Sequence, residues 1–144
     1  MRPKRTLLLS YSYLGMGQLG LAPNFRRAAE NATIEVKEYN ILGFASALRA
    51  ANMGLPFLPS RGGFGSDIVK ELGFKTITCP YTGQELLAVP AFHLDVCVIH
   101  ALQADCYGNV QAHSPVESTI DYDVAMARAG KRLVVTAERV VSPE

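Results

Sequence analysis

A glycine-rich loop over residues 61–67 carries the most evident chemistry in this chain. Its sequence is Arg-Gly-Gly-Phe-Gly-Ser-Asp, and its closely spaced glycines are Gly62, Gly63 and Gly65. Consecutive glycines let several backbone N–H groups point the same way, which forms a nest for a phosphate or for the oxyanion of an acyl group. Ser66 adds a hydroxyl donor and Arg61 a permanent positive charge. We therefore expect an anion site here, and the alternative is a surface loop whose glycines only satisfy turn geometry.

A second glycine pattern lies near the N-terminus. Gly15-Met-Gly17-Gln-Leu-Gly20 matches the G-x-G-x-x-G fingerprint of dinucleotide sites, and Glu38 follows eighteen residues after Gly20, within reach of a ribose hydroxyl. However, Pro23 has no N–H in the turn where donors should face the phosphate. Two interpretations stay open: a nucleotide-binding or CoA-binding loop, and a tight turn between a strand and a helix.

Four thiol and imidazole groups raise the question of a metal site, and they are Cys97, His100, Cys106 and His113. Cys97 and His100 lie three apart in an expected strand, so their side chains point to opposite faces. The second pair lacks the spacing of a zinc finger, and no motif joins Cys106 to His113 as in a Cys–His hydrolase. We expect no metal, a core thiol at Cys97, and a hydrogen-bonded core or strand-end histidine at His100.

Polar residues also follow a buried strand directly. Asp105 and Asn109 come after an apolar run, and ligands of open α/β sheets bind beyond the carboxyl ends of strands. Asp105 is equally suited to an Asx turn with its own backbone. Glu38, Glu85 and Glu117 are candidate carboxylate nucleophiles, although nothing in their local sequence distinguishes one from the others.

The elements that must position these residues alternate between strands and helices. Expected strands cover residues 6–13, 34–39, 74–78, 85–89, 94–102, 109–112 and 133–137, and expected helices cover 23–31, 41–52, 68–72 and 120–129. Expected caps are Asn40, Ser66 or Asp67, and Thr119. Two prolines and three glycines predict no regular structure over residues 55–67. The alternation indicates an α/β fold with an open, mostly parallel sheet and helices on both faces.

Composition limits the function further. The chain has 144 residues and 15.6 kDa, which predicts a single domain over residues 1–144. Hydrophobic residues make up 49% and charged residues 19%, which excludes a disordered chain, and a net charge of +1 favours neither nucleic acid nor a membrane surface. We expect no membrane span and no signal peptide. An odd set of three separated cysteines predicts reduced thiols and a cytoplasmic protein.

Several motifs, taken in order, resemble those of one enzyme family. They are Leu21-Ala-Pro-Asn-Phe-Arg-Arg, Gly54-Leu-Pro-Phe-Leu-Pro-Ser-Arg with Gly65-Ser-Asp, Ala104-Asp-x-x-Gly-Asn109, and Val134-Val-Thr-Ala-Glu138. The chain resembles the alpha subunit of class I coenzyme A transferases, of the type found in glutaconate CoA-transferase, over nearly all of its length. The resemblance implies the coenzyme A transferase (NagB/RpiA-like) fold and a hetero-oligomer with a homologous beta subunit.

The resemblance also implies a reaction. The family moves CoA between carboxylic acids, with acyl-CoA and a free acid as substrates, CoA as co-substrate and no tightly bound cofactor. The thioester is attacked by a glutamate of the beta subunit, which is covalent catalysis by a carboxylate. Glu30-Asn31-Ala32 lacks the glycine of that motif, so we assign no catalytic residue to this chain. The implied substrate-binding and CoA-binding residues are Arg61, Gly62, Gly63, Gly65, Ser66 and Asn109.

Two features set the chain apart from that pattern. Family alpha subunits are much longer, so we expect a partial domain whose exposed apolar surface promotes aggregation or oligomerisation when the chain is made alone. Some relatives are hydrolases that open rings of CoA-linked intermediates, and the residue that decides between hydrolase and transferase lies on the beta subunit. The alternatives to a transferase subunit are therefore a hydrolase subunit and a non-catalytic nucleotide or CoA module that uses residues 15–20.

Overall fold

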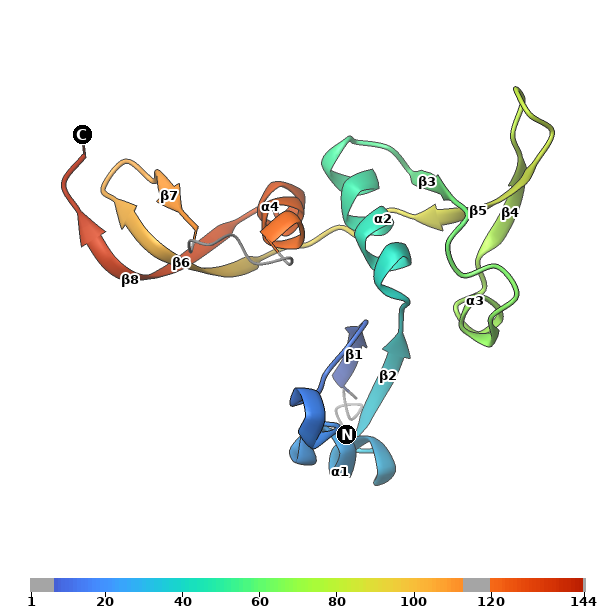
Figure 1. Ribbon diagram of the computed structural model, residues 1–144, viewed down its shortest axis with the longest axis horizontal. Coiled ribbons are helices and arrows are strands. Elements are labelled where there is room, and N and C mark those ends of the chain that lie inside the picture. The colour runs from blue at the N-terminus through green and yellow to red at the C-terminus, as the bar shows by residue number, and fades with distance from the viewer. Residues whose placement is uncertain (1–6, 113–119, 144) are drawn as a thin grey trace, which may run out of the picture. The chain divides into compact units, whose positions relative to one another are not determined.

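The computed structural model describes residues 7–112 and 120–143, and its backbone falls into two compact units. The first unit comprises Met1–Ser46 with Pro59–Val89, and the second comprises Ala47–Leu58 with Pro90–Glu144. The chain crosses between the units within α2 (Ile41–Asn52), within β3 (Phe57–Ser60) and at the end of β5 (Glu85–Pro90). Figure 1 labels these three elements. The single domain expected over residues 1–144 stays a prediction.

The first unit begins with a β-α-β segment. Strand β1 (Leu7–Tyr11) pairs in parallel with β2 (Ile34–Glu38), and α1 (Pro23–Glu30) connects them. Pro23 occupies the start of the helix, where the missing N–H costs nothing. The rings of Tyr11 and Phe25 meet edge-to-face at 5.0 Å and fix the helix against the strand. The expected strand, helix and strand are confirmed here.

An antiparallel hairpin follows in the same unit. Strands β4 (Lys75–Thr78) and β5 (Glu85–Pro90) pair across a turn in which the Gly83 N–H donates to the Cys79 carbonyl at 2.9 Å. The predicted turn over residues 80–83 is therefore confirmed. β3 lies on the other side of β5, in the order β3-β5-β4. The expectation of no regular structure over residues 55–67 is wrong for β3, because an edge strand tolerates a proline that lacks a donor.

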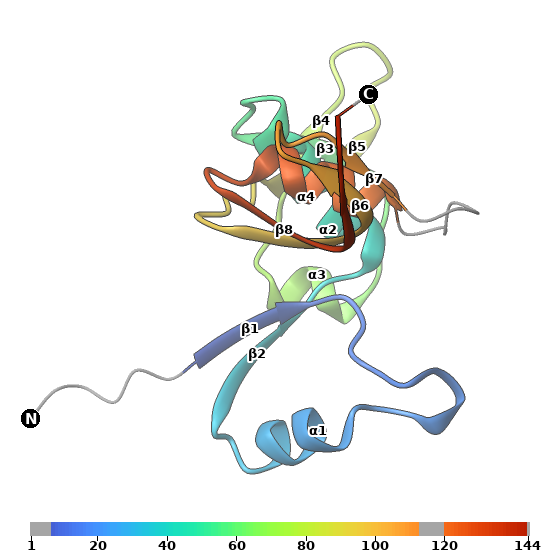
Figure 2. The same ribbon diagram turned by 90° about the vertical axis from the view of Figure 1, so that its left-hand side faces the viewer.

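The second unit is built on a mixed three-stranded sheet. Its elements are β6 (Cys97–Asp105), β7 (Val110–Gln111), α4 (Ile120–Ala129) and β8 (Leu133–Val141). The strand order is β7-β6-β8, with β7 antiparallel and β8 parallel to β6. Helix α4 packs against β6 (Figure 2), where Cys97, Ala101 and Ala125 are buried.

A glycine joins α4 to β8. An added Cβ at Gly130 would lie 2.9 Å from Cβ of Cys97, so a larger residue would push the connection away from the sheet. Gly130 ends the helix as the sequence predicts, and Gly54 ends α2 with a φ of +67°.

The α/β class is confirmed, and the strands pair in three small sheets rather than one continuous sheet among the described residues. Asn40 caps α2 as predicted, because its Oδ1 accepts the Gly43 N–H at 2.7 Å. Ser66 precedes α3 (Asp67–Glu71) but makes no side-chain cap, and Thr119 lies outside the described residues. No helix within residues 7–112 and 120–143 is long and apolar enough to cross a membrane.

Candidate functional site

The glycine-rich loop of residues 61–66 has the backbone that its sequence predicts. Gly63 and Gly65 adopt φ angles of +95° and +79°, in the left-handed region that favours glycine. The Gly62 N–H donates to Oγ of Ser60 at 3.1 Å, and Oγ of Ser66 donates to the Gly63 carbonyl at 2.7 Å. The Ser66 hydroxyl therefore closes the loop on itself, whereas the sequence suggested that it would serve an anion.

The loop lies against the start of α2. An added Cβ at Gly63 would come 2.6 Å from Nδ2 of Asn40, and one at Gly62 would come 3.1 Å from Cβ of Leu42. Asn40 is the residue that caps α2, so the side chain that holds the first turn of the helix also lies against Gly63 of the loop. The sequence identified Asn40 as a cap but did not indicate this second contact.

The centre of the loop offers backbone donors. Within the described part of the chain, the N–H groups of residues 63–65 donate no hydrogen bond. Arg61 is exposed at the beginning of the loop. Three adjacent donors with a nearby guanidinium suit a carboxylate, a phosphate or a developing oxyanion.

The motif Ala104-Asp-x-x-Gly-Asn109 forms the turn between β6 and β7. Oδ1 of Asp105 accepts the N–H groups of Tyr107 and Asn109, each at 2.9 Å, and Oδ2 accepts Nδ2 of Asn109 at 2.7 Å. Gly108 has a φ of +87°, which the turn requires. The hydrogen bond from the Asn109 side chain is the main cause that lowers the pKa of Asp105 below its ordinary value. The Asx-turn interpretation of Asp105 is thus confirmed.

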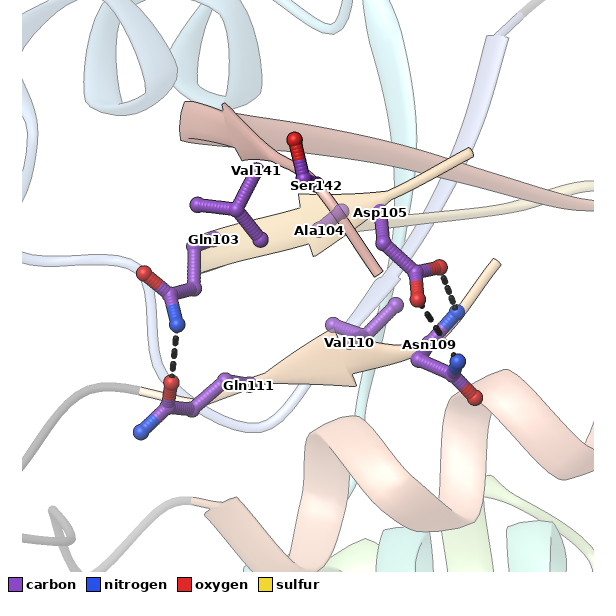
Figure 3. Close-up of a pocket in the computed structure, with 8 residues that line it drawn as sticks. All are labelled: Gln103, Ala104, Asp105, Asn109, Val110, Gln111, Val141 and Ser142. Atoms are coloured by element: carbon purple, nitrogen blue, oxygen red, sulfur yellow. Dashed lines mark hydrogen bonds between the residues drawn. The ribbon is translucent and has the colours of Figure 1, made fainter. Parts of the chain in front are cut away.

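A cavity of about 620 Å³ lies beside this turn, at the carboxyl ends of β6 and β8 (Figure 3). Asn109 lines it with its amide oxygen directed away from Asp105 (Figure 3). Gln103 and Gln111 also line it and hydrogen-bond to each other through their amides. Neither glutamine was predicted from the sequence, although the predicted turn places residues 103 and 111 opposite each other across the hairpin.

The loop of residues 61–66 belongs to the first unit, and Asn109 belongs to the second. Their roles in binding a substrate or CoA stay predictions.

Backbone N–H groups of the pattern from Gly15 to Gly20 donate hydrogen bonds to acceptors within residues 13–20. The N–H of Gly17 donates to the Tyr13 hydroxyl at 3.1 Å, that of Met16 to the Gly20 carbonyl at 2.8 Å, and that of Gly20 to the Gly17 carbonyl at 3.2 Å. Helix α1 begins only at Pro23, so the loop does not open directly into it. Glu38 hydrogen-bonds to Tyr11, whose pKa is raised first by burial and then by this carboxylate. The arrangement favours the tight turn over a phosphate cradle.

The cysteine and histidine side chains in the described part of the chain do not gather into a metal site. Cys97 is a buried core thiol as predicted, and burial raises its pKa. His100 is exposed in the middle of β6, with Nδ1 2.9 Å from Oγ1 of Thr136, so its expected core or strand-end position is wrong. Within the described residues no three His, Cys, Asp or Glu side chains gather as metal ligands. His113 lies outside those residues.

The glutamates that the structure describes lie at the surface. Glu30 is exposed and pairs with Nε of Arg26 at 2.7 Å, which agrees with leaving it out of the catalytic residues. Glu85 is exposed at the start of β5. Glu117 lies outside the described residues.

Known proteins match this chain over almost all of its length. The family model described as Coenzyme A transferase matches residues 4–144. The A-type subunit of the 3-oxoadipate CoA-transferase of Pseudomonas knackmussii is 36% identical over 137 residues, which cover 92% of this chain and 47% of that protein. The cholesterol ring-cleaving hydrolase IpdA subunit of Rhodococcus jostii is 36% identical over 144 residues, which cover 92% of this chain and 48% of that protein.

A solved structure agrees with these matches. The glutaconate coenzyme A-transferase of Acidaminococcus fermentans superposes with a TM-score of 0.81 at 28% identity, over 94% of this chain and 47% of that chain. The present chain thus spans about half the length of these relatives.

Proposed function

The chain belongs to the coenzyme A transferase family, and we propose that it acts as an A-type subunit that moves CoA from an acyl-CoA to a carboxylic acid. The observation that carries this proposal is the 36% identity to the A-type subunit of a 3-oxoadipate CoA-transferase over 92% of the chain. The proposed partner is a beta subunit that brings the glutamate nucleophile. Coenzyme A is a co-substrate that leaves after each turnover.

In the proposed reaction the partner's glutamate attacks the thioester carbonyl, and the CoA thiolate leaves as an anhydride forms. The thiolate then attacks the glutamyl carbonyl, which gives a glutamyl-CoA thioester and releases the first acid. The second acid reverses these steps. Negative charge develops on a carbonyl oxygen each time, and the N–H groups of residues 63–65 are suited to stabilise it because they donate no hydrogen bond within the described chain.

We propose that the loop of residues 61–66 binds the substrate or CoA, with Arg61 as the cation that holds a substrate carboxylate or phosphate. We propose separately that Asn109 binds substrate or CoA in the second unit, through the amide oxygen that points away from Asp105 beside the cavity. The three free cysteines, Cys79, Cys97 and Cys106, suit a reducing compartment, and we propose a cytoplasmic hetero-oligomer.

A second candidate function is that of a subunit of a CoA-thioester hydrolase. The specific observation in its favour is the equal identity, 36%, to a cholesterol ring-cleaving hydrolase IpdA subunit. The two functions differ in the acceptor, which is a carboxylate in the transferase and water in the hydrolase.

The test is an acyl-CoA exchange assay on this chain co-expressed with a beta-type subunit of the family. A transferase forms the new acyl-CoA only when a second carboxylic acid is added, whereas a hydrolase consumes acyl-CoA without it. Arg61→Ala should lower kcat/KM by about 100-fold, and Arg49→Ala, an exposed arginine in the last turn of α2, should leave it unchanged.

A well-folded complex without exchange would refute the transferase function. Equal effects of Arg61→Ala and Arg49→Ala would remove the loop from the site while leaving the transferase function in place.

A further inference from the structure

The side-chain amide of Asn40 contacts two different elements with its two ends. Its Oδ1 accepts the N–H of Gly43 at 2.7 Å in the first turn of α2. An atom that accepts a hydrogen bond from an N–H group is the amide oxygen, so the nitrogen Nδ2 is the other end. An added Cβ at Gly63 would lie 2.6 Å from Nδ2, which places this nitrogen against the glycine-rich loop of residues 61–66.

The cap of α2 uses only the oxygen of the Asn40 side chain. Serine and aspartate cap helices about as well as asparagine, and neither of them has an amide N–H. Within the part of the chain that the structure describes, Nδ2 of Asn40 donates no hydrogen bond. The amide nitrogen is therefore a donor that the helix does not use.

The backbone donors of the loop begin beside this nitrogen. The N–H groups of residues 63–65 donate no hydrogen bond among the described residues. The Gly63 carbonyl, in contrast, already accepts the Ser66 hydroxyl at 2.7 Å. Backbone N–H groups and asparagine amides are the two kinds of neutral donor that form oxyanion holes. Gly63 and Asn40 bring one of each kind next to each other.

Packing holds the loop against the first turn of α2. An added Cβ at Gly62 would lie 3.1 Å from both Cβ and Cδ1 of Leu42, and one at Gly63 would lie 3.2 Å from Cγ2 of Val69 on α3. Close packing of this kind leaves the loop little room to shift relative to Asn40. The donors are therefore fixed in advance, which is the condition under which they stabilise a transition state.

We propose that Nδ2 of Asn40 donates a hydrogen bond to the thioester carbonyl oxygen as that oxygen becomes negative, together with the N–H groups of residues 63–65. This inference rests on the proposed function, in which the loop stabilises the oxyanion. All of these donors are neutral, which suits an oxygen that carries charge only in the transition state. The permanent charge of Arg61 instead suits a carboxylate or a phosphate.

Two substitutions remove the amide donor and keep the cap. Asn40→Ser and Asn40→Asp are made in the chain co-expressed with a beta-type subunit of the family, and acyl-CoA consumption is measured with an acceptor acid present. Asn40→Ser should lower kcat about 100-fold. KM should change by less than about 3-fold, because the hydrogen bond strengthens only in the transition state. Asn40→Asp should lower kcat about 1,000-fold, because it also places a carboxylate where negative charge develops.

Asn24→Asp is the matched control for the asparagine substitutions. Asn24 is exposed in the first turn of α1, where its Oδ1 accepts Nη2 of Arg27 at 2.8 Å, and we expect its replacement to leave kcat unchanged. Leu42→Ala removes another contact of α2 with the loop without removing a donor, so it should lower kcat less than Asn40→Ser does.

Urea unfolding separates the donor from the cap. Asn40→Ser and Asn40→Asp should unfold at the urea midpoint of the parent chain, because both keep a capping oxygen. Asn40→Ala loses the cap as well as the donor, and we expect it to unfold at a lower urea concentration.

Four results would overturn the inference. An unchanged kcat in Asn40→Ser, with an active parent complex, would remove Asn40 from the site and leave the proposed function standing. A loss of kcat that Leu42→Ala equals, or that accompanies a urea midpoint as low as that of Asn40→Ala, would make the role of Asn40 purely structural. A raised KM at unchanged kcat would place the amide on the ground-state substrate. A well-folded parent complex that consumes no acyl-CoA would refute the proposed function and this inference together.

Discussion

At the scale of single residues, the site depends on side chains that hold backbone in place. Asp105 accepts hydrogen bonds from the backbone of Tyr107 and from both the backbone and the side chain of Asn109. This explains why the motif has an aspartate and an asparagine four positions apart, with a glycine directly before the asparagine. The same contacts direct the remaining amide oxygen of Asn109 away from Asp105 (Figure 3).

Asp105→Asn tests that role through pH. The lowered pKa of Asp105 means that the folded chain prefers the ionised carboxylate, chiefly because of the Asn109 side chain. Its stabilising contribution is complete above the unfolded pKa of about 3.9 and is lost as the pH falls through the lower folded value. We expect Asp105→Asn to lower the urea midpoint at pH 7, with a smaller difference from the parent chain at pH 3.

Asp67→Asn is the control for that measurement. Asp67 forms an exposed ion pair with Lys70 at 3.1 Å, and such pairs contribute little. If the two variants behave alike at both pH values, the Asp105 carboxylate does not organise the turn.

At the scale of elements, the glycine-rich loop of residues 61–66 packs against the first turn of α2. A Cβ added at Gly63 would lie 2.6 Å from Nδ2 of Asn40, so the Asn40 side chain would have to move, while Gly65 has open space around it. Both have positive φ angles, so the two glycines share the backbone requirement and differ in the packing.

Gly63→Ala and Gly65→Ala separate these causes. Gly65→Ala should cost about 1 kcal/mol of unfolding free energy from the unfavourable φ alone. Gly63→Ala should cost about 2 kcal/mol or more, because it also displaces the cap residue of α2. Urea unfolding followed by circular dichroism measures both values. Equal losses would show that the loop does not depend on Asn40.

The sequence predicted most elements because their local signals agree with the fold. Asn40, Gly54 and Gly130 mark helix ends, and the turn over residues 80–83 marks a hairpin. Strand β3 escaped prediction because edge pairing overrides the local effect of Pro59. The hydrogen bond from Ser66 to the Gly63 carbonyl and the one between Gln103 and Gln111 were also not predicted. Spacing in the sequence does not determine which partner a polar side chain binds.

At the scale of the whole molecule, the length of the chain differs from that of its relatives. The chain matches the coenzyme A transferase family over residues 4–144 and yet spans about half the length of the curated relatives that it matches. The expectation that a partial domain exposes apolar surface and aggregates when made alone stays a prediction. The described loop offers donors and a cation, whereas a nucleophilic carboxylate is proposed to come from the partner.

The central claim is that the nucleophilic glutamate belongs to the partner subunit and not to this chain, and intact-mass spectrometry tests it most directly. The assembled complex is incubated with acyl-CoA alone, without an acceptor acid, and the two proteins are then separated and weighed. We predict that CoA becomes attached through a thioester to a glutamate of the beta-type subunit, while the mass of the present chain stays unchanged. A CoA adduct on this chain, at Glu30 or at any other carboxylate, would contradict the claim that the nucleophile belongs to the partner subunit.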